Sequence, residues 1–317
     1  MGLTAGFGVY APSGVSAEYE ASYMGRYFAR TSDLKTVNFQ PTVSYKINRD
    51  FSVGGGVYAS YVTGTLSQAI NPLSLEGIAD ILQIPESVTY KGDGYGEVEG
   101  DAWGFGYNIG AIYQVTEPLR LGVTYHSKVD YSILGDYTTT YPDYESSPGV
   151  VSPGGEVTQN AALNVSTPDS LDLGLVYELD KRWTLMTGAT WTQWSLFEEL
   201  IVEQEEGGEI ISYVPQFWED TWSYGLGASY KLDRRWTLRA GYAYDPSPVS
   251  DDHVAARLPL GDRNIFSFGT QYRVTRDLDV DLAFSYILEN EVTVNDELLT
   301  GPNEPIPQFL YTGEYDS

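Results

Sequence analysis

The sequence predicts an all-β protein, a transmembrane antiparallel up-and-down β-barrel. Apolar and polar residues alternate along many segments, and a short turn recurs five times between such segments. The composition agrees, because 33 Gly, 26 Tyr and 14% aromatic residues among 317 are typical of β architecture. A mean hydropathy of -0.25, without a long apolar run, excludes a membrane-spanning helix, so strands must make any membrane span.

The recurring turn places a Tyr at the end of one segment and an apolar residue six positions later. The intervening residues include Asn, Asp, Pro and charged side chains, which favour tight turns. The five copies run from Tyr45 to Phe51, Tyr113 to Leu119, Tyr177 to Trp183, Tyr230 to Trp236 and Tyr272 to Leu278. Each copy predicts a hairpin turn between two antiparallel strands.

The segments between these turns alternate with period 2, which predicts strands with one apolar, aromatic face and one small, polar face. In the last of them, Leu278 and Phe284 share one face, and Asp279 and Asp281 share the other. Eleven strands are predicted, at 2–10, 33–46, 51–63, 102–114, 119–131, 168–178, 183–194, 220–231, 236–246, 263–274 and 278–289.

The composition of the two faces favours a membrane barrel. A soluble barrel would carry many Lys and Glu outside, whereas the polar face here is mostly Gly, Ser, Thr, Asn and Asp. Tyr and Trp lie near both strand ends, as in the aromatic girdles of outer-membrane barrels. The alternative is a β-sandwich with Tyr-rich strands. The short turns would face the periplasm, and the long connections 63–101, 132–168, 195–219 and 247–262 the exterior.

Residues 1–317 are expected to form a single, incomplete barrel domain. Single-chain bacterial barrels have an even number of strands, and a sheet edge cannot lie unpaired in lipid. The sequence begins at once with a predicted strand and without a secretion signal. We therefore expect further strands, and a signal, in the full protein.

Charge and composition exclude several other classes of function. A net charge of -26 opposes binding to nucleic acid. The chain has no Cys, and no spacing typical of a metal or nucleotide site is evident, so we expect no metal and no cofactor. His126 and His253 are the two histidines, and neither has the setting of a hydrolase triad. We therefore expect that the protein is not an enzyme.

Several stretches resemble the FadL family of outer-membrane transporters for long-chain fatty acids and aromatic hydrocarbons. They occur in family order across nearly the whole chain, at 14–19, 32–36, 103–108, 191–197, 236–239, 247–249 and 262–263. The resemblance implies a fourteen-stranded barrel with an N-terminal hatch, of which this sequence begins at the third strand and lacks the hatch, the first two strands and the last. It also implies passive uptake, with ligand capture between outer loops and lateral exit where the third strand kinks.

The resemblance aligns the lateral opening with Ala11, Pro12, Ser13 and Gly14. Independently, Pro12 cannot donate to a strand ladder and Gly14 permits backbone angles that strands avoid. The alternative is that these residues form an ordinary turn after the first strand.

The outer capture groove would involve a short amphipathic helix within 72–82, which the spacing of its apolar residues predicts. The candidate ligand-binding residues are Leu73, Leu75, Ile78 and Leu82. The alternative is that they pack on the barrel rim.

Alternation directs Arg120, Lys128 and Arg239 into the lumen, where a cation could pair with a fatty-acid carboxylate. The alternative is that these charges pair with lumen acids or with the hatch. Members of the family that carry fatty acids place basic residues near the head group, but the position aligned just after Leu66, itself a lumen candidate, is Gln68. This departure leaves an uncharged hydrocarbon open as the substrate.

The sequence thus predicts a monomeric, multi-pass barrel in the outer membrane of a Gram-negative bacterium. Its function would be passive transport of hydrophobic compounds, either long-chain fatty acids or aromatic hydrocarbons. Expected partners are these small molecules, outer-membrane lipid and lipopolysaccharide. The alternatives are a general porin and an outer-membrane adhesin or structural barrel.

Overall fold

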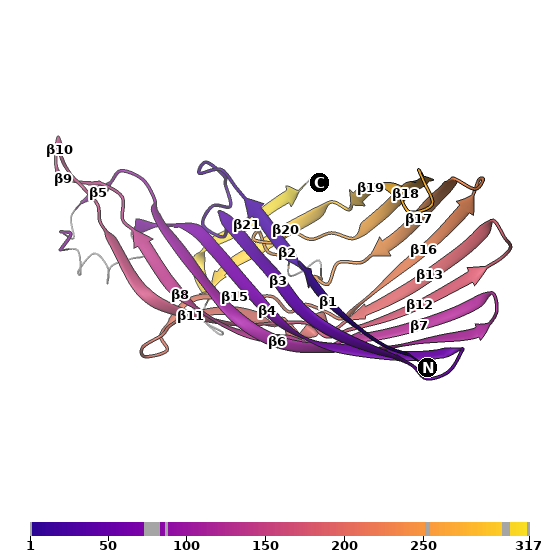
Figure 1. Ribbon diagram of the computed structural model, residues 1–317. Coiled ribbons are helices and arrows are strands. Elements are labelled where there is room, and N and C mark those ends of the chain that lie inside the picture. The colour runs from indigo at the N-terminus through magenta and orange to yellow at the C-terminus, as the bar shows by residue number, and fades with distance from the viewer. Residues whose placement is uncertain (1, 73–82, 86–87, 251–253, 300–304, 316–317) are drawn as a thin grey trace.

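The structure is a computed structural model that describes residues 2–72, 83–85, 88–250, 254–299 and 305–315. Antiparallel strands dominate it (Figure 1). They are β1 (Gly2–Tyr10), β2 (Gly14–Glu18), β3 (Thr31–Lys46), β4 (Phe51–Ile70), β5 (Thr89–Tyr90), β6 (Gly94–Thr116), β7 (Leu119–His126), β8 (Val129–Thr140), β9 (Tyr144–Ser147), β10 (Val150–Ser152), β11 (Glu156–Thr167), β12 (Ser170–Glu178), β13 (Trp183–Thr192), β14 (Glu199–Gln204), β15 (Ile210–Pro215), β16 (Thr221–Lys231), β17 (Trp236–Asp245), β18 (Arg263–Arg273), β19 (Asp279–Glu289), β20 (Val292–Leu299) and β21 (Pro305–Tyr315).

Helical structure is sparse in the described residues. A 3-10 helix, η2 (Trp194–Leu196), follows β13. No helix among the described residues has the length and apolarity needed to cross a membrane. Residues 73–82, which hold most of the predicted amphipathic helix, lie outside the described part of the chain.

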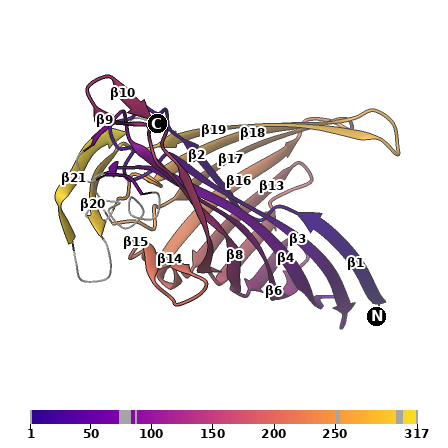
Figure 2. The same cartoon turned by 90° about the vertical axis from the view of Figure 1, so that its left-hand side faces the viewer.

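Eleven strands follow one another around the wall and confirm the eleven predicted segments. Three of the eleven are interrupted strands, each made of two segments: β1 and β2, β7 and β8, and β12 and β11. The order around the wall is β1/β2, β3, β4, β6, β7/β8, β12/β11, β13, β16, β17, β18, β19. Within the described residues, β1 and β19 each have a single partner strand, so the sheet has two edges. Figure 2 shows its strong curvature around an interior, with the β1 and β18–β19 regions at separate borders.

The recurring turns are the hairpins that the repeat predicts, and the third residue of the turn organises most of them. Asn48 Oδ1 accepts hydrogen bonds from the backbone N–H groups of Asp50 and Phe51, at 2.8 Å each. Asp180 and Asp233 accept the equivalent pairs, at 2.6 to 2.9 Å. A short polar side chain at this position therefore replaces the missing ladder bonds of the turn.

Two rows of aromatic side chains border the outer face of the wall. Near the short turns the paired rings are Phe51–Tyr113, Trp183–Tyr230 and Trp236–Tyr272. At the other border they include Tyr61–Trp103, Tyr107–Tyr125 and Tyr242–Phe266. From Tyr113 to Trp103 a strand rises about 34 Å, and a tilt of about 40° reduces this to about 26 Å, the height of a membrane-spanning apolar band. The band is outward-facing, since Phe105 is 74% exposed.

The polarity of both faces reverses beyond the upper aromatic row. On β3, β4 and β6 the outward residues change within one register step from Val37, Tyr61 and Trp103 to Lys35, Thr63 and Asp101. The inner face changes in the opposite sense, because Val62 is fully buried and Leu66 packs against the interior cluster. The wall therefore continues past the membrane band with water outside and an apolar interior.

This reversal explains where the predicted strand limits differ from the structure. Much of the predicted long connections is strand: β4 and β6 extend into 63–101, β8 and β11 occupy most of 132–168, and β14 and β15 form a hairpin in 195–219. The predicted strand 119–131 is interrupted at 127–128, where His126 and Val129 both face the interior. One extra residue there inverts the alternation, so a single period-2 pattern cannot cover both halves of the strand.

Candidate functional site

A cavity of about 620 Å³ occupies the interior at and above the upper aromatic row. Its apolar lining comes from strands whose inner faces have become apolar, namely Leu34, Leu66, Val98, Val129, Ile133, Leu163, Val165 and Leu200. Eight buried residues around it form one cluster that includes Tyr58, Tyr131 and Leu163. Such a lining favours an apolar ligand, because each buried methylene group is worth about 0.8 kcal/mol.

Three aromatic rings, here called the aromatic cluster, line one side of this cavity. Trp194 lies in η2, Phe197 follows it, and Trp218 precedes β16. The Trp218 ring meets the Trp194 ring edge-on at 5.1 Å and the Phe197 ring at 4.7 Å between centroids. The rings belong to the connections between the membrane band and the β14–β15 hairpin, where no sequence period marks them.

The cavity also reaches the gap between β1 and β2, here called the strand interruption. Pro12, Ser13 and Gly14 line it, while Ala11 belongs to the same gap and is not among the lining residues. β1 pairs Tyr10 with Asn38, and β2 resumes with Gly14 opposite Lys35, so one extra residue is accommodated. The Thr36 hydroxyl donates to Ser13 O at 2.7 Å and closes the β3 side of the interruption.

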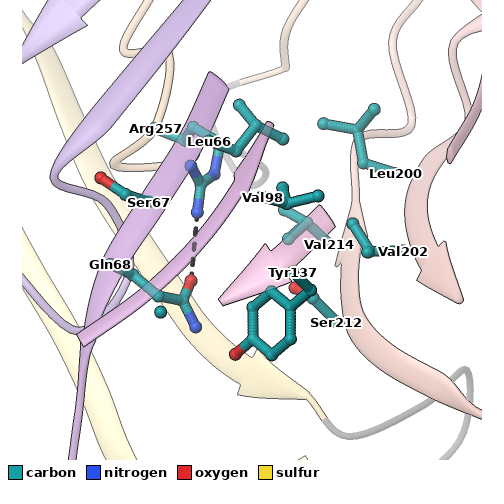
Figure 3. A pocket seen from close by; sticks show the side chains of 11 residues that line it. Leu66, Ser67, Gln68, Val98, Tyr137, Leu200, Val202, Ser212, Val214 and Arg257 are labelled. Carbon is teal, nitrogen blue, oxygen red and sulfur yellow. Dashed lines mark hydrogen bonds between the residues drawn. The ribbon is translucent and has the colours of Figure 1, made fainter. Parts of the chain in front are cut away.

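Arg257 supplies a buried positive charge beside the cavity, and Figure 3 shows it at the smaller pocket that adjoins the cavity. The residue is 5% exposed, and its guanidinium donates to Phe28 O at 2.9 Å, Thr31 O at 3.2 Å and Gln68 Oε1 at 3.1 Å. A smaller pocket of about 30 Å³ adjoins it and is lined on the other side by Leu66, Val98, Leu200, Val202 and Val214. The arrangement sets a guanidinium next to apolar side chains at one end of the cavity.

Sequence reasoning did not identify Arg257, because it lies in the predicted loop 247–262, outside every periodic segment. One signal was present: the apolar run from Val254 to Ala256 directly precedes this cation. The structure also gives a role to Gln68, which the resemblance marked as a departure. Its amide oxygen holds the guanidinium of Arg257, so a cation reaches this place from a different loop.

The three lumen cations predicted from alternation do not line the cavity. Arg120 is exposed on β7 near the lower aromatic row. Arg239 pairs with Asp281 at 2.7 Å in the lower lumen. Lys128 does not point into the lumen, because the extra residue at 127–128 turns it outward, where its ammonium meets Asp130 at 3.0 Å. Leu66 lies in the cavity lining.

His126 and Asp172 are among the other titratable groups that line the cavity. A distance of 3.7 Å separates His126 Nε2 from Asp172 Oδ2. Thr190 donates to Asp172 at 2.7 Å, so the carboxylate is held on this wall. Tyr137 borders the small pocket near Arg257, and burial raises the pKa of its phenol. The candidate capture residues Leu73, Leu75, Ile78 and Leu82 lie outside the described residues.

Comparison with known proteins relates the chain to outer-membrane transporters. A family model described as "Outer membrane protein transport protein (OMPP1/FadL/TodX)" matches residues 2–314. The long-chain fatty acid transport protein of Escherichia coli strain K12 is 27% identical over 298 residues, which are 89% of this chain and 67% of that protein. This chain thus spans about two thirds of the length of that relative.

Solved structures agree with the fold. The crystal structure of a Pseudomonas aeruginosa FadL homologue matches with a TM-score of 0.81 at 26% identity, over 94% of this chain and 69% of that one. The Ralstonia pickettii toluene transporter TbuX matches with a TM-score of 0.67 at 20% identity, over 90% and 73%. At this identity the second likeness concerns the fold alone. The resemblance read from the sequence is confirmed, and the barrel is one of the Gram-negative outer membrane.

Proposed function

This chain belongs to the outer membrane transport protein family that includes FadL and TodX, and we propose on this premise that it passes hydrophobic compounds through the outer membrane passively. The observation that carries the proposal is the apolar cavity, which extends from the aromatic cluster to the strand interruption. Ligand would be caught between the outer loops, where Leu73, Leu75, Ile78 and Leu82 remain the candidates, and would then enter this cavity.

We propose a hydrophobic acid as the preferred substrate. Arg257 places a positive charge at one end of a cavity whose lining is otherwise largely apolar. A carboxylate there would gain charge-assisted hydrogen bonds, while its hydrocarbon chain fills the apolar space. An uncharged hydrocarbon could use the apolar space but not the cation. The E. coli relative is named for long-chain fatty acids, and TbuX for toluene.

Lateral exit through the strand interruption is the route that the energetics favour. A chain of about 15 methylene groups loses about 12 kcal/mol when it passes from an apolar site into water. Leaving sideways at Pro12–Gly14, which lie beside residues 35–37 at the upper border of the membrane band, would bring it to lipid without a passage through the lower lumen. A Cβ at Gly14 would meet only Leu34 O, at 3.5 Å, so a side chain fits there without backbone strain.

Uptake by full-length protein in lipid vesicles tests the proposal, with labelled oleate, toluene and a sugar as solutes. We expect passage of oleate and exclusion of the sugar. Gly14→Arg should abolish oleate passage, whereas Gly225→Arg, at an open position of the lower lumen wall, should not. Sugar passage without oleate passage would instead indicate a porin. If no solute passes, the adhesin or structural alternative gains support. Unchanged oleate uptake in Gly14→Arg would refute lateral exit.

A further inference from the structure

A shallow hollow of about 490 Å³ lies on the lipid-facing side of the wall, over the strands β7, β12 and β13. These strands are neighbours in the sheet (Figure 1). Leucine and valine side chains of β7 and β12 line the hollow, together with the short side chains of Thr187 and Ala189 on β13. Aromatic rings border it, with Tyr113 on the side of β6 and Tyr224 on the side of β16.

The surrounding lipid must fill this hollow. It lies between the two aromatic rows of the outer face, so acyl chains of the membrane surround it. An empty hollow would forfeit the dispersion contacts that its lining atoms can make. Lipid tails are as apolar as leucine, however, so an apolar lining alone gives little preference for one lipid over another. A preference must come from the polar border of the membrane band.

A cation is held at the lower border, below the hollow. Arg182 lies in the turn between β12 and β13, and its Nη1 donates to the hydroxyl of Tyr230 on β16 at 3.3 Å. Tyr230 is the register partner of Trp183, and the centroids of their rings lie 4.6 Å apart. Both rings belong to the lower aromatic row of the outer face. The guanidinium is therefore held toward the lipid.

Within the described part of the chain, Arg182 forms no ion pair with a carboxylate. Asp180 lies in the same turn, but its Oδ1 accepts the backbone N–H groups of Arg182 and Trp183 at 2.6 and 2.8 Å. The turn 178–183 has two basic and two acidic residues, and the next turn, 231–236, has three basic and one acidic residue. The border is thus positive in a chain of net charge -26, and it favours anionic headgroups.

The cation and the hollow are spaced like the phosphate and an acyl chain of one phospholipid. Thr187 and Trp183 are four residues apart on β13, which is about 13 Å along the strand and about 10 Å across the membrane at a tilt of about 40°. The headgroup region extends about 5 to 8 Å beyond the hydrocarbon on each side. A phosphate at Arg182 therefore brings the upper part of an acyl chain to the hollow. Short turns of such barrels face the periplasm, so this lipid belongs to the inner leaflet.

We propose that this part of the wall binds an anionic phospholipid of the inner leaflet, with its phosphate at Arg182 and one acyl chain in the hollow. Tyr230 is a positioning residue, because its hydroxyl holds the guanidinium at the lipid border, and Trp183 packs against its ring. The site selects its lipid by charge at the border and by packing in the hollow. It is independent of the transport proposed above, because it lies on the other face of the wall from the apolar cavity.

The turn between β16 and β17 repeats the cation without the hollow and supplies a matched control. Arg235 Nη1 donates to the hydroxyl of Tyr272 at 3.3 Å, and the Trp236 ring lies 4.5 Å from the Tyr272 ring. The described residues of β17 and β18 are not part of the lining of the hollow. Comparing Arg182 with Arg235 therefore separates a two-part lipid site from a general attraction of lipid to the positive border.

The test titrates delipidated full-length protein in detergent with phosphatidylglycerol or with phosphatidylcholine of the same acyl chains, and native mass spectrometry measures the first bound lipid. We expect phosphatidylglycerol to bind at least about 5-fold more tightly. Arg182→Gln should remove most of this preference, and Arg182→Lys, which keeps the charge, should retain it. Arg235→Gln should change it by less than about 2-fold.

A second pair of variants tests the hollow. Ala189→Phe fills it and should weaken the binding of both lipids at least about 5-fold, since the acyl chain loses its place. Ala240→Phe makes the same change on the outer face of β17, outside the hollow, and should leave both affinities unchanged.

Each outcome supports or overturns the site. Heat-modifiable mobility on gels first shows that each variant is folded. Equal affinity of the unaltered protein for the two lipids would refute the proposal. Equal losses in Arg182→Gln and Arg235→Gln would also overturn it, because the border as a whole would then attract the lipid. Unchanged binding in folded Ala189→Phe would show that no acyl chain occupies the hollow. Transport stands in every case, since the cavity is untouched.

Discussion

Arg257→Gln removes the guanidinium charge beside the apolar cavity and keeps a polar side chain of moderate length. In the proposed complex, the guanidinium donates at least one charge-assisted hydrogen bond to the ligand carboxylate. Such a bond is worth about 1.5 to 3 kcal/mol. At about 1.4 kcal/mol per factor of ten, oleate should bind about 10-fold to 150-fold more weakly to the variant. Methyl oleate has no charge and should lose less than about 3-fold.

Two controls separate charge from packing. Arg257 also donates to Phe28 O, Ser32 Oγ and Gln68 Oε1, so its replacement costs stability of about 1 kcal/mol for each bond lost. Arg257→Lys loses several of these bonds but keeps the charge, and should retain most of the preference for oleate over its ester. Arg239→Gln removes a lumen charge that pairs with Asp281 and should leave both affinities unchanged.

The assay is displacement of a fluorescent polyene fatty acid from detergent-solubilised full-length protein by oleate and by methyl oleate. The reasoning predicts a change in the ratio of the two affinities. An equal loss for both ligands in Arg257→Gln would show that Arg257 serves packing and does not recognise the carboxylate. If neither affinity changes, the ligand does not reach Arg257.

Three further predictions concern the barrel. Val57→Lys, within the apolar band, should lower the free energy of unfolding in lipid by about 2 to 4 kcal/mol. Thr65→Lys, on the same strand above the band, should change it by less than about 0.5 kcal/mol. Urea titrations compare the two variants, and equal losses of stability would contradict the assigned membrane limit. Gly135→Ala should impair folding, because its Cβ would overlap a backbone carbonyl oxygen of β6. Gly122→Ala is the control, since no atom lies within 4 Å of the Cβ it would add. Heat-modifiability gels measure the fraction of folded protein, and comparable fractions for the two variants would contradict the prediction. Backbone hydrogen bonds from Trp183 and Arg182 lower the pKa of Asp180 below 3.8. The stabilisation of the turn by this carboxylate is therefore present at neutral pH and is lost as the pH falls below about 4. An NMR titration of the carboxyl group measures this pKa, and an ordinary value would refute the prediction.

The membrane wall could be predicted from the sequence because its signals are local. A five-residue turn with Asn48 or Asp180 at its centre, and alternation along the strands beside it, can each be recognised within about ten residues. Lipid outside and small residues inside give the same pattern on every strand of the band. The number and order of the wall strands followed from these signals.

The upper wall was harder to predict because its pattern changes phase. At 127–128 an extra residue exchanges the two faces, so Val129 faces inward where the earlier alternation would direct it outward. Lys128 was assigned to the lumen for the same reason. Alternation shows that a strand has two faces, but which one is inside depends on the neighbouring strands.

The sequence by itself thus determined that strands cross a membrane and where they turn, since both depend on neighbouring residues and on the solvent that each face meets. Tertiary structure decided what the interior can bind. Arg257 meets Gln68 across 189 positions of the chain, and Gln40 reaches Asn108 over the backbone of Gly56. These contacts arise from the curvature and register of the whole sheet, which bring together residues that no local pattern relates.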